Sequence, residues 1–242
     1  GFAARSQMTW IFGFFALMFG SVPSALLAFL SWSVGESICR ERWGNKLAAF
    51  DALFQRRWNT ATVADSALRG LACGITLAAA LCLFSLMVQE WNAWPFASIV
   101  AANQLGHGQA WASLGLGFIW GSLPLLLTTF LVLLPLLVRR FGVPIGASLA
   151  TLATTVMIFN GLMPSPLSLG FAVALPCAAA LVGLFLAYDF LTVLITTYVG
   201  QVLVAGGSLL FAQDANLEAQ IWVALALGAV PLALSLRALG SD

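Results

Sequence analysis

Few side chains in this sequence could carry out acid–base or metal chemistry. His107 is the single histidine and lies in the motif GHG, with no cysteine, aspartate or glutamate beside it. A zinc site in a protein uses three or four protein ligands, so one histidine cannot build it and no metal site is predicted. We interpret His107 as a loop residue. An axial ligand to a pigment or haem is the alternative.

Asp189 is the only charged residue between positions 168 and 211. An ionisable side chain at membrane depth is by default a functional candidate, for example as a proton relay. The apolar run around Asp189, however, is too long for one membrane-spanning helix, which needs about 20 residues. We therefore expect Asp189, beside Tyr188, to mark the boundary between two helices.

Three uncharged polar residues are further candidates for a site. Asn160, Thr197 and Gln201 lie in otherwise apolar stretches. A polar group buried in hydrocarbon costs free energy unless it is hydrogen-bonded, and polar side chains on neighbouring membrane helices bond to one another. We interpret these residues as a structural cluster between helices. A ligand pocket is the alternative.

Composition defines the elements that must position these residues. Hydrophobic residues make up 61% of the 242-residue chain and charged residues 8%, whereas soluble domains carry about 25% charged residues. The chain is therefore predicted to be an all-α, polytopic transmembrane helical bundle that forms one integral membrane domain, 1–242. Its net charge of +1 argues against nucleic acid as a partner, because phosphate binding needs a dense basic patch.

Hydrophobic runs and turn signals predict about seven membrane spans. Their ranges are 9–34, 71–88, 111–138, 143–163, 168–188, 190–211 and 221–239. Pro124 and Pro135 are expected to distort the third span, because a proline removes a backbone donor from a helix. No glutamate, lysine or arginine lies near the middle of a span, which argues against proton-coupled pumps, voltage sensors and carboxylate-based transporters.

The segment 35–70 concentrates the charge, with six of the ten lysine and arginine residues. A charge at the centre of a bilayer costs roughly 2.5–3.5 kcal/mol, so we expect this segment to be a cytoplasmic loop. Within it, the stretch from Asn45 to Arg57 places Leu47, Phe50 and Phe54 on one helical face. This pattern predicts an interfacial amphipathic helix.

The cations fall on one side of the predicted bundle. The expected membrane-surface anchors are Arg40, Arg42, Lys46, Arg56, Arg57, Arg69, Arg139, Arg140, Trp43 and Trp58. Together with Arg237, they place nine of the ten positive residues on one side, and only Arg5 lies opposite. The positive-inside rule then places the N-terminus outside and the C-terminus in the cytoplasm.

Small residues and cysteines are interpreted as packing features. The patches at 72–74 and 204–207 contain glycine and alanine, which let membrane helices approach closely. The four cysteines lack metal-binding spacing and are expected to be buried free thiols.

Several motifs follow one another in an order that matches a known group. ES..RERW..KLAAFDAL starts at Glu36, PLLVRRFG ends the third span, NGLMPSP ends the fourth, and LVGLFLAYDFLTVLITTYVGQVL ends at Leu203. From Glu36 to about Leu203 the chain resembles the CPBP group. These are bacterial intramembrane glutamate proteases of the CAAX-processing and bacteriocin-immunity type.

The resemblance implies a set of catalytic positions. The group uses a glutamate pair before RRFG, a histidine before an NxP-like turn, and a second histidine followed four residues later by Asn or Asp. Here the first position falls within 125–130, which contains no acid, and the second falls near Asn160. The third falls near Thr197, with Gln201 downstream. The resemblance therefore implies a copy that lacks the titrating residues of the protease.

These observations predict a non-catalytic subunit or scaffold of the bacterial cytoplasmic membrane. Its expected partners are membrane lipids and other membrane protein subunits. No cofactor is predicted, and bound lipid or pigment is an open alternative. Two other functions remain as alternatives: an intramembrane protease or lipid-handling hydrolase of the CPBP type, and a carrier for a neutral or apolar solute.

Overall fold

The computed structural model describes residues 18–19, 22–58, 60–89, 115, 117–162, 167–210 and 215–239, and within these ranges it contains helices and no strands. The helices are α2 (Val22–Arg42), α3 (Ala48–Phe54), α4 (Ala61–Gln89), α9 (Val143–Leu162), α10 (Leu167–Ala187), α11 (Phe190–Leu210) and α12 (Ala215–Leu239). One further run comprises η2 (Phe118–Ser122), α7 (Leu123–Leu127), η3 (Thr128–Leu133) and α8 (Leu134–Phe141). The predicted all-α class is confirmed.

Four described helices are long and apolar enough to cross a membrane. They are Val22–Arg42, Ala61–Met87, Phe118–Phe141 and Leu169–Ala187. Three shorter apolar helices within the described residues are Val143–Ile158, Phe190–Ala205 and Trp222–Ala233. The structure therefore supports a transmembrane helical bundle, while the number of seven spans stays a prediction.

Two helices extend into the segment 35–70 that was expected to be a loop. Helix α2 continues to Arg42, and α4 already begins at Ala61. The charged residues tolerate this extension because they form pairs one helical turn apart, at 3.0 Å for Arg40 with Glu36 and 3.6 Å for Arg69 with Asp65. The expected loop is thus shorter.

Other boundaries follow the apolar runs closely. Helices α9, α10 and α11 begin and end within a residue of the expected spans. Helix α12 starts at Ala215, six residues before the expected position, so part of the sequence QDANLE is helical. Residues 9–17, 20 and 21 of the expected first span lie outside the described ranges, as do 111–114 and 116 of the expected third span.

The predicted amphipathic helix is the short helix α3. Leu47, just before it, is fully buried, Phe50 is half-buried and Phe54 is exposed. The ring of Phe50 lies 5.1 Å from that of Trp32 on α2 and 5.3 Å from that of Phe190 on α11. The apolar face of this segment therefore packs partly against the bundle itself.

The run Phe118–Phe141 contains two π-helical segments, each just before a proline. The segment η2 precedes Pro124, and η3 precedes Pro135. A proline lacks the N–H for an ordinary helical bond and its ring collides with the preceding turn, so a wider turn relieves both problems. The expected distortion by these prolines is confirmed.

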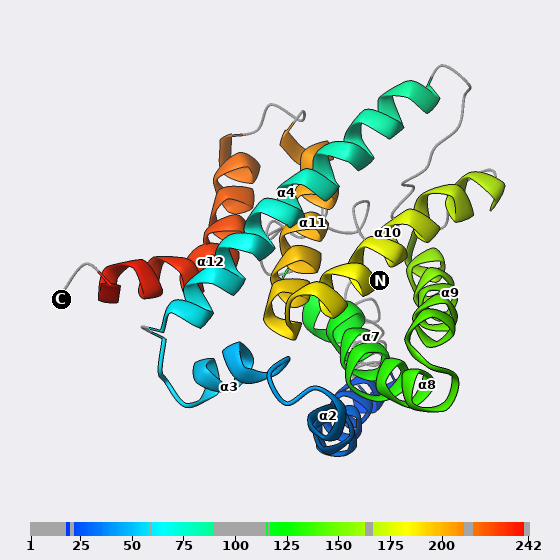
Figure 1. Cartoon of the computed structure of the whole chain (residues 1–242). Coiled ribbons are helices and arrows are strands. Elements are labelled where there is room, and N and C mark those ends of the chain that lie inside the picture. Colours follow the sequence, from blue (N-terminus) through cyan, green and yellow to red (C-terminus); the bar gives the residue numbers. More distant parts are fainter. Residues whose placement is uncertain are drawn as a thin grey trace.

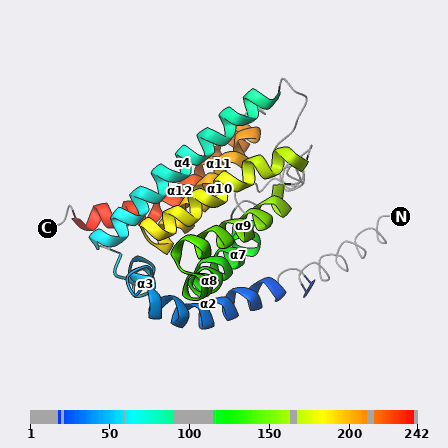
Figure 2. The ribbon, with the colours of Figure 1, turned by 45° about the vertical axis from the view of Figure 1, so that its right-hand side comes forward.

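The helices pack in a sequence of neighbours across the bundle. Helix α4 crosses α11 and also contacts α12, while α10 lies between α11 and α9 (Figure 1). Helix α9 contacts α8, and α2 packs along η3 and α7 (Figure 2). Side chains of η3, α8, α10 and α11 meet in a core that contains Phe130, Leu134, Phe185 and Phe190.

The contact between α4 and α11 is close because α4 presents glycines to α11. A β-carbon at Gly70 would lie 2.7 Å from Cβ of Ile195, and one at Gly74 would lie 2.9 Å from Cβ of Val199. The expectation that the patch at 72–74 allows close helix packing is confirmed for Gly74. In the second patch, at 204–207, the surroundings of the glycines at 206 and 207 lie outside the described part.

All four cysteines are free. Cys39 and Cys177 are buried, whereas Cys73 is half-buried and Cys82 is exposed. The expectation of buried thiols is therefore correct for Cys39 and Cys177 and wrong for Cys82, which lies on the outer face of α4.

Candidate functional site

A dense set of polar contacts lies where α10 ends and α11 begins. Asp189 follows the end of α10, and its Oδ1 accepts a hydrogen bond of 2.8 Å from the backbone N–H of Thr192. This is the N-cap arrangement, in which a side-chain oxygen satisfies a donor of the first helical turn. The expectation that Asp189 marks a helix boundary is confirmed.

The other oxygen of Asp189 faces α4. The hydroxyl of Ser66 donates a hydrogen bond of 2.6 Å to Oδ2, and the hydroxyl of Thr192 lies 3.3 Å from the same atom. Ser66 and Thr192 are both buried, while Asp189 is partly exposed. The carboxylate thus joins α4 to α11 at the edge of the protein interior.

Lys46 approaches the same place from the loop between α2 and α3. Its Nζ donates hydrogen bonds of 2.7 Å to the carbonyl of Leu186 and 2.6 Å to that of Tyr188. Its own carbonyl accepts a 3.0 Å bond from the N–H of Phe190. A cation at the C-terminal carbonyls of a helix satisfies free acceptors and complements the helix dipole. We call Lys46, Ser66, Asp189 and Thr192 the Asp189 junction.

Lys46 and Asp189 carry the opposite charges of the Asp189 junction, and the surroundings affect the pKa of the lysine. Burial lowers the pKa of the Lys46 amine, and the negative charge of Asp189 opposes that effect. Two donors of the amine are already engaged with carbonyls. With two of its N–H groups held by carbonyls at the end of α10, the geometry of Lys46 is that of a helix cap.

A cavity of about 130 Å³ lies beside the Asp189 junction. Its polar lining consists of Asn45, Thr62, Asp65, Ser66, Arg69 and Asp189. Arg69 lies over the ring of Tyr188 at 5.0 Å and near Asp65 at 3.6 Å. The arginine thus has partners within the protein.

The predicted surface anchors gather at the same end of the bundle. Arg40 bonds to Asp51 at 2.6 Å, and Arg139 pairs with Glu41 at 3.4 Å, which links the ends of α8 and α2. Arg140 lies 5.8 Å from the ring of Phe141.

The remaining anchors differ in their surroundings. Arg56, Arg57 and Trp58 are exposed after α3. Trp43 packs edge-on against Phe185 at 5.7 Å, so it contributes to the core. The anchoring of these residues at a membrane surface stays a prediction.

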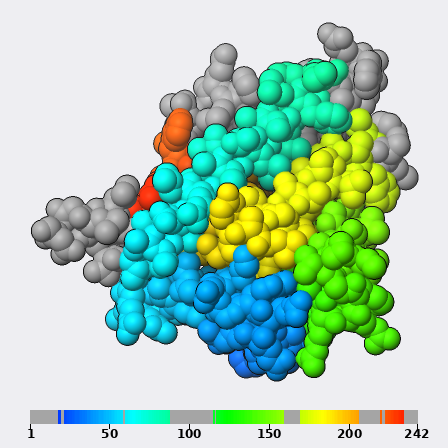
Figure 3. All heavy atoms as spheres, in the orientation of Figure 1, coloured from blue at the N-terminus to red at the C-terminus, as the bar shows by residue number. Residues whose placement is uncertain are grey.

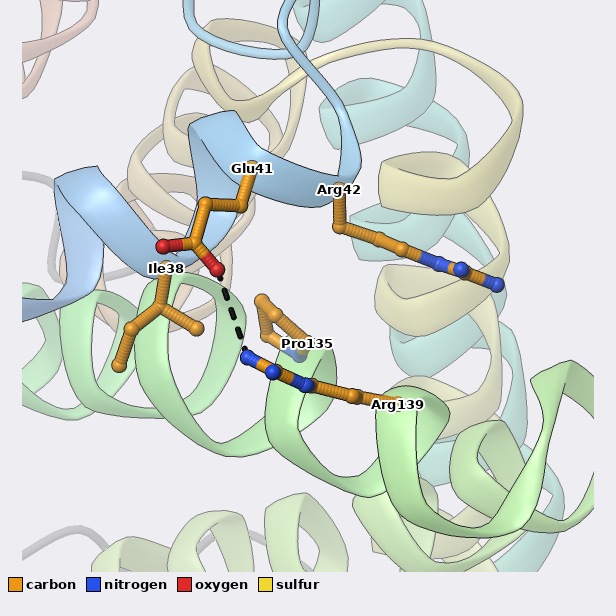
Figure 4. A pocket seen from close by; sticks show the side chains of 5 residues that line it. All are labelled: Ile38, Glu41, Arg42, Pro135 and Arg139. Atoms are coloured by element: carbon orange, nitrogen blue, oxygen red, sulfur yellow. Dashed lines mark hydrogen bonds and ion pairs between the residues drawn. The ribbon is translucent and has the colours of Figure 1, made fainter.

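A second cavity, of about 170 Å³, lies between the ends of α2 and α8 (Figure 4). Its lining residues are Ile38, Glu41, Arg42, Pro135 and Arg139. The predicted anchors Arg42 and Arg139 therefore share one cavity.

The predicted polar cluster of Asn160, Thr197 and Gln201 stays a prediction, because only the side chains of Thr197 and Gln201 are described. The hydroxyl of Thr197 donates to the carbonyl of Val193, within its own helix, at 2.9 Å. Gln201 Oε1 instead accepts a 2.8 Å bond from the hydroxyl of Ser122 on η2. The side chain of Asn160 and the whole of His107 lie outside the described part.

Hydroxyl groups occupy the interior near the position that the resemblance assigns to the glutamate pair. Thr128 lies 2.7 Å from the hydroxyl of Ser31, and Thr129 donates to the sulfur of Met157 at 3.3 Å. Among the described residues, the buried polar side chains are Ser31, Ser66, Thr129, Thr154, Thr155, Thr192 and Thr196. The described part of the chain contains no group of three or more His, Cys, Asp or Glu side chains that could hold a metal ion.

Sequence reasoning missed Ser66, Ser122 and the capping role of Lys46. For Ser66 a signal was present, because it precedes Gly70 and Gly74 at intervals of four and so shares their helical face. The partner of Lys46 had no local signal, since the end of α10 lies 140 residues away.

Comparisons with known proteins gave no match to a family model, to a curated protein or to a solved structure. The likeness to the CPBP group therefore rests on the sequence motifs alone.

Proposed function

We propose that this chain is a non-catalytic subunit or scaffold of a membrane assembly. The observation that carries the proposal is the role of Lys46 and Asp189, the two ionisable side chains of the Asp189 junction. Lys46 caps the end of α10, and Asp189 caps the start of α11 while it holds Ser66 of α4. Both groups are thus committed to joining helices.

The positions that the resemblance assigns to catalysis support this role. General acid–base catalysis needs a group whose pKa is near the working pH. Thr128, Thr129, Thr197 and Gln201 do not meet this need, and each is engaged in a hydrogen bond inside the bundle.

Outward-facing apolar side chains offer contact surfaces. On α12, Trp222, Val223 and Leu227 are exposed, with 60% of Trp222 accessible. Association of helices within a bilayer depends on close packing of such surfaces. We place the contact with partner helices on this face of α12 and assign the remaining outer apolar surfaces to lipid.

The distribution of charge supports one orientation. Lys46, Arg69 and Arg139 lie at the bundle end that contains the Asp189 junction and the ends of α2 and α8. Under the positive-inside rule, this end faces the cytoplasm of a bacterial cell and the N-terminus lies outside.

Co-purification tests the proposal. We expect the chain, extracted from its native membrane in a mild detergent, to retain other membrane subunits in fixed stoichiometry. Trp222→Ala should reduce their amount, whereas Phe54→Ala, which removes an exposed ring from α3, should not.

A peptidase assay separates this function from the protease alternative. The purified chain is incubated with peptide and prenyl-peptide substrates, beside the Lys46→Met and Asp189→Asn variants. Cleavage by the wild-type chain that either variant abolishes would overturn the proposal. A monodisperse monomer without partner subunits would also count against it.

A further inference from the structure

The cavity between α2 and α8 combines opposite charges over an apolar floor. In Figure 4 the side chain of Arg139 extends past Pro135 to Glu41, whereas that of Arg42 extends in the opposite direction. Glu41 is on the rim, with a carboxylate oxygen 3.4 Å from Arg139. Ile38 contributes the half-buried apolar wall on α2.

The charged groups of this cavity are available to a ligand. Arg42 has no ion-pair partner in the part of the chain that the structure describes. The pair of Glu41 and Arg139 is long, and 68% and 72% of the two side chains is exposed. Exposed pairs of this kind contribute little and can exchange partners.

An apolar stripe on α2 continues from the cavity towards the middle of the bundle. Leu27, Leu30, Val34 and Ile38 follow one another at intervals of three or four residues, which places them on one helical face. The first three are exposed. Figure 3 shows the outer surface of α2 beside that of α8.

The length of the stripe matches one leaflet of a bilayer. Eleven residues separate Leu27 from Ile38, which corresponds to roughly 16 Å along a helix. The hydrocarbon core of a bilayer is about 30 Å thick, so half of it is about 15 Å. A lipid chain that starts at the cavity would thus reach the bilayer centre near Leu27.

We propose that this cavity binds the phosphoethanolamine headgroup of a membrane phospholipid. The exposed side chain of Arg42 turns towards Arg139, and the two guanidinium groups then donate hydrogen bonds to the oxygens of a phosphate between them. The ammonium group lies at Glu41, and an acyl chain covers the stripe on α2.

The carboxylate of Glu41 is the feature that favours this headgroup over an anionic one. Phosphatidylglycerol would bring a phosphate to the arginines but would leave Glu41 without a cation, whereas phosphoethanolamine satisfies all three groups. At roughly 30 Å³ per water molecule, the cavity of about 170 Å³ holds a group of about five or six heavy atoms. This is the size of the phosphate with part of the ethanolamine.

Lipid retention by the full chain tests the inference. The protein is placed in nanodiscs with equal amounts of phosphatidylethanolamine and phosphatidylglycerol, extracted gently, and its bound lipids are counted by native mass spectrometry. The wild-type chain should retain phosphatidylethanolamine about fivefold over phosphatidylglycerol, the size of effect that a partly exposed ion pair produces.

Three variants make the test specific. Arg42→Gln should lose about fivefold of the retained phosphatidylethanolamine, and Glu41→Gln should remove the preference between the two lipids. Arg57→Gln, which changes an exposed arginine outside the cavity, should behave as the wild type. Circular dichroism confirms that each variant keeps its helical content.

Two results would overturn the inference. One is equal retention of the two lipids by the wild-type chain, and the other is an equal loss in Arg42→Gln and Arg57→Gln. The inference depends on a membrane location but needs no partner subunit. Its failure would therefore leave the co-purification result unchanged, and the two proposals can fail separately.

Discussion

Ser66 on α4 donates a hydrogen bond of 2.6 Å to the carboxylate of Asp189, which lies 123 residues later in the chain. The same carboxylate caps α11 through the N–H of Thr192. One side chain therefore both starts a helix and fastens it to its neighbour. This contact explains how a nearly uncharged bundle positions α4, α10 and α11 at its charged end.

Replacement of Ser66 by alanine should destabilise the fold. The carboxylate of Asp189 would lose its donor from α4, and a hydrogen bond to a charged group contributes about 1.5–3 kcal/mol when buried. Because Asp189 is partly exposed, we expect the free energy of unfolding to fall by about 1 kcal/mol. Denaturant titration in detergent micelles measures this change.

Ser37→Ala is the matched control for this prediction. Ser37 is exposed and bonds only to the carbonyl of Val34 within its own helix. Its removal should change the free energy of unfolding by less than about 0.5 kcal/mol. Equal effects of the two substitutions would show that the link from Ser66 to Asp189 contributes nothing specific.

Gly74→Ala should weaken the contact between α4 and α11. The new methyl group would lie 2.9 Å from Cβ of Val199 and 3.0 Å from the carbonyl oxygen of Thr196, so the helices must separate. Overpacking of this kind costs about 1–3 kcal/mol. The thermal unfolding temperature reports the loss.

The control for Gly74 is Gly183 on α10, where an added β-carbon meets no atom within 4 Å. Gly183→Ala should raise stability by up to about 1 kcal/mol, since alanine is the better helix former. If both substitutions changed the stability in the same direction, the close approach of α4 and α11 would not explain the effect of Gly74→Ala.

Arg56→Gly should stabilise the end of α3. Arg56 has a φ of 57°, and the N–H groups of Arg56 and Arg57 bond to the carbonyls of Leu53 and Ala52, as in a Schellman motif. Glycine is the preferred residue at this left-handed position, and the strain in other residues is about 1 kcal/mol. An increase in the unfolding midpoint is expected, with Arg57→Gly giving none.

Stability should rise with pH through the Lys46 contribution. Burial lowers the pKa of the amine below its ordinary value of 10.5. The unfolded state then binds more protons than the folded state just below pH 10.5, so the free energy of unfolding increases as the pH approaches that value. The difference between wild type and Lys46→Met should therefore shift in favour of wild type with rising pH, and a shift in the opposite direction would contradict the burial of Lys46.

Local patterns predicted much of the fold. The apolar runs gave the bounds of α9, α10 and α11. Pro124 and Pro135 pointed to the helical distortions within Phe118–Phe141. Hydropathy alone placed the charged ends of α2 and α4 in a loop, because it does not register ion pairs within a helix. The pair of Arg40 and Glu36 shows that such ends remain helical.

The site was harder to predict because its contacts join distant parts of the chain. Asp189 could be recognised as a helix boundary from its position in a long apolar run. Lys46 was interpreted as a surface anchor, since its carbonyl partners appear only when α10 folds back beside the loop. The bond from Ser122 to Gln201 could not be predicted either, because the two residues lie on elements far apart in the sequence.

The intact mass of the particle extracted from native membranes tests the scaffold function most directly. Native mass spectrometry after extraction in mild detergent should find this chain together with other membrane subunits in a fixed ratio. A single chain without partners, which also hydrolyses a peptide or prenyl-peptide substrate, would contradict a non-catalytic scaffold.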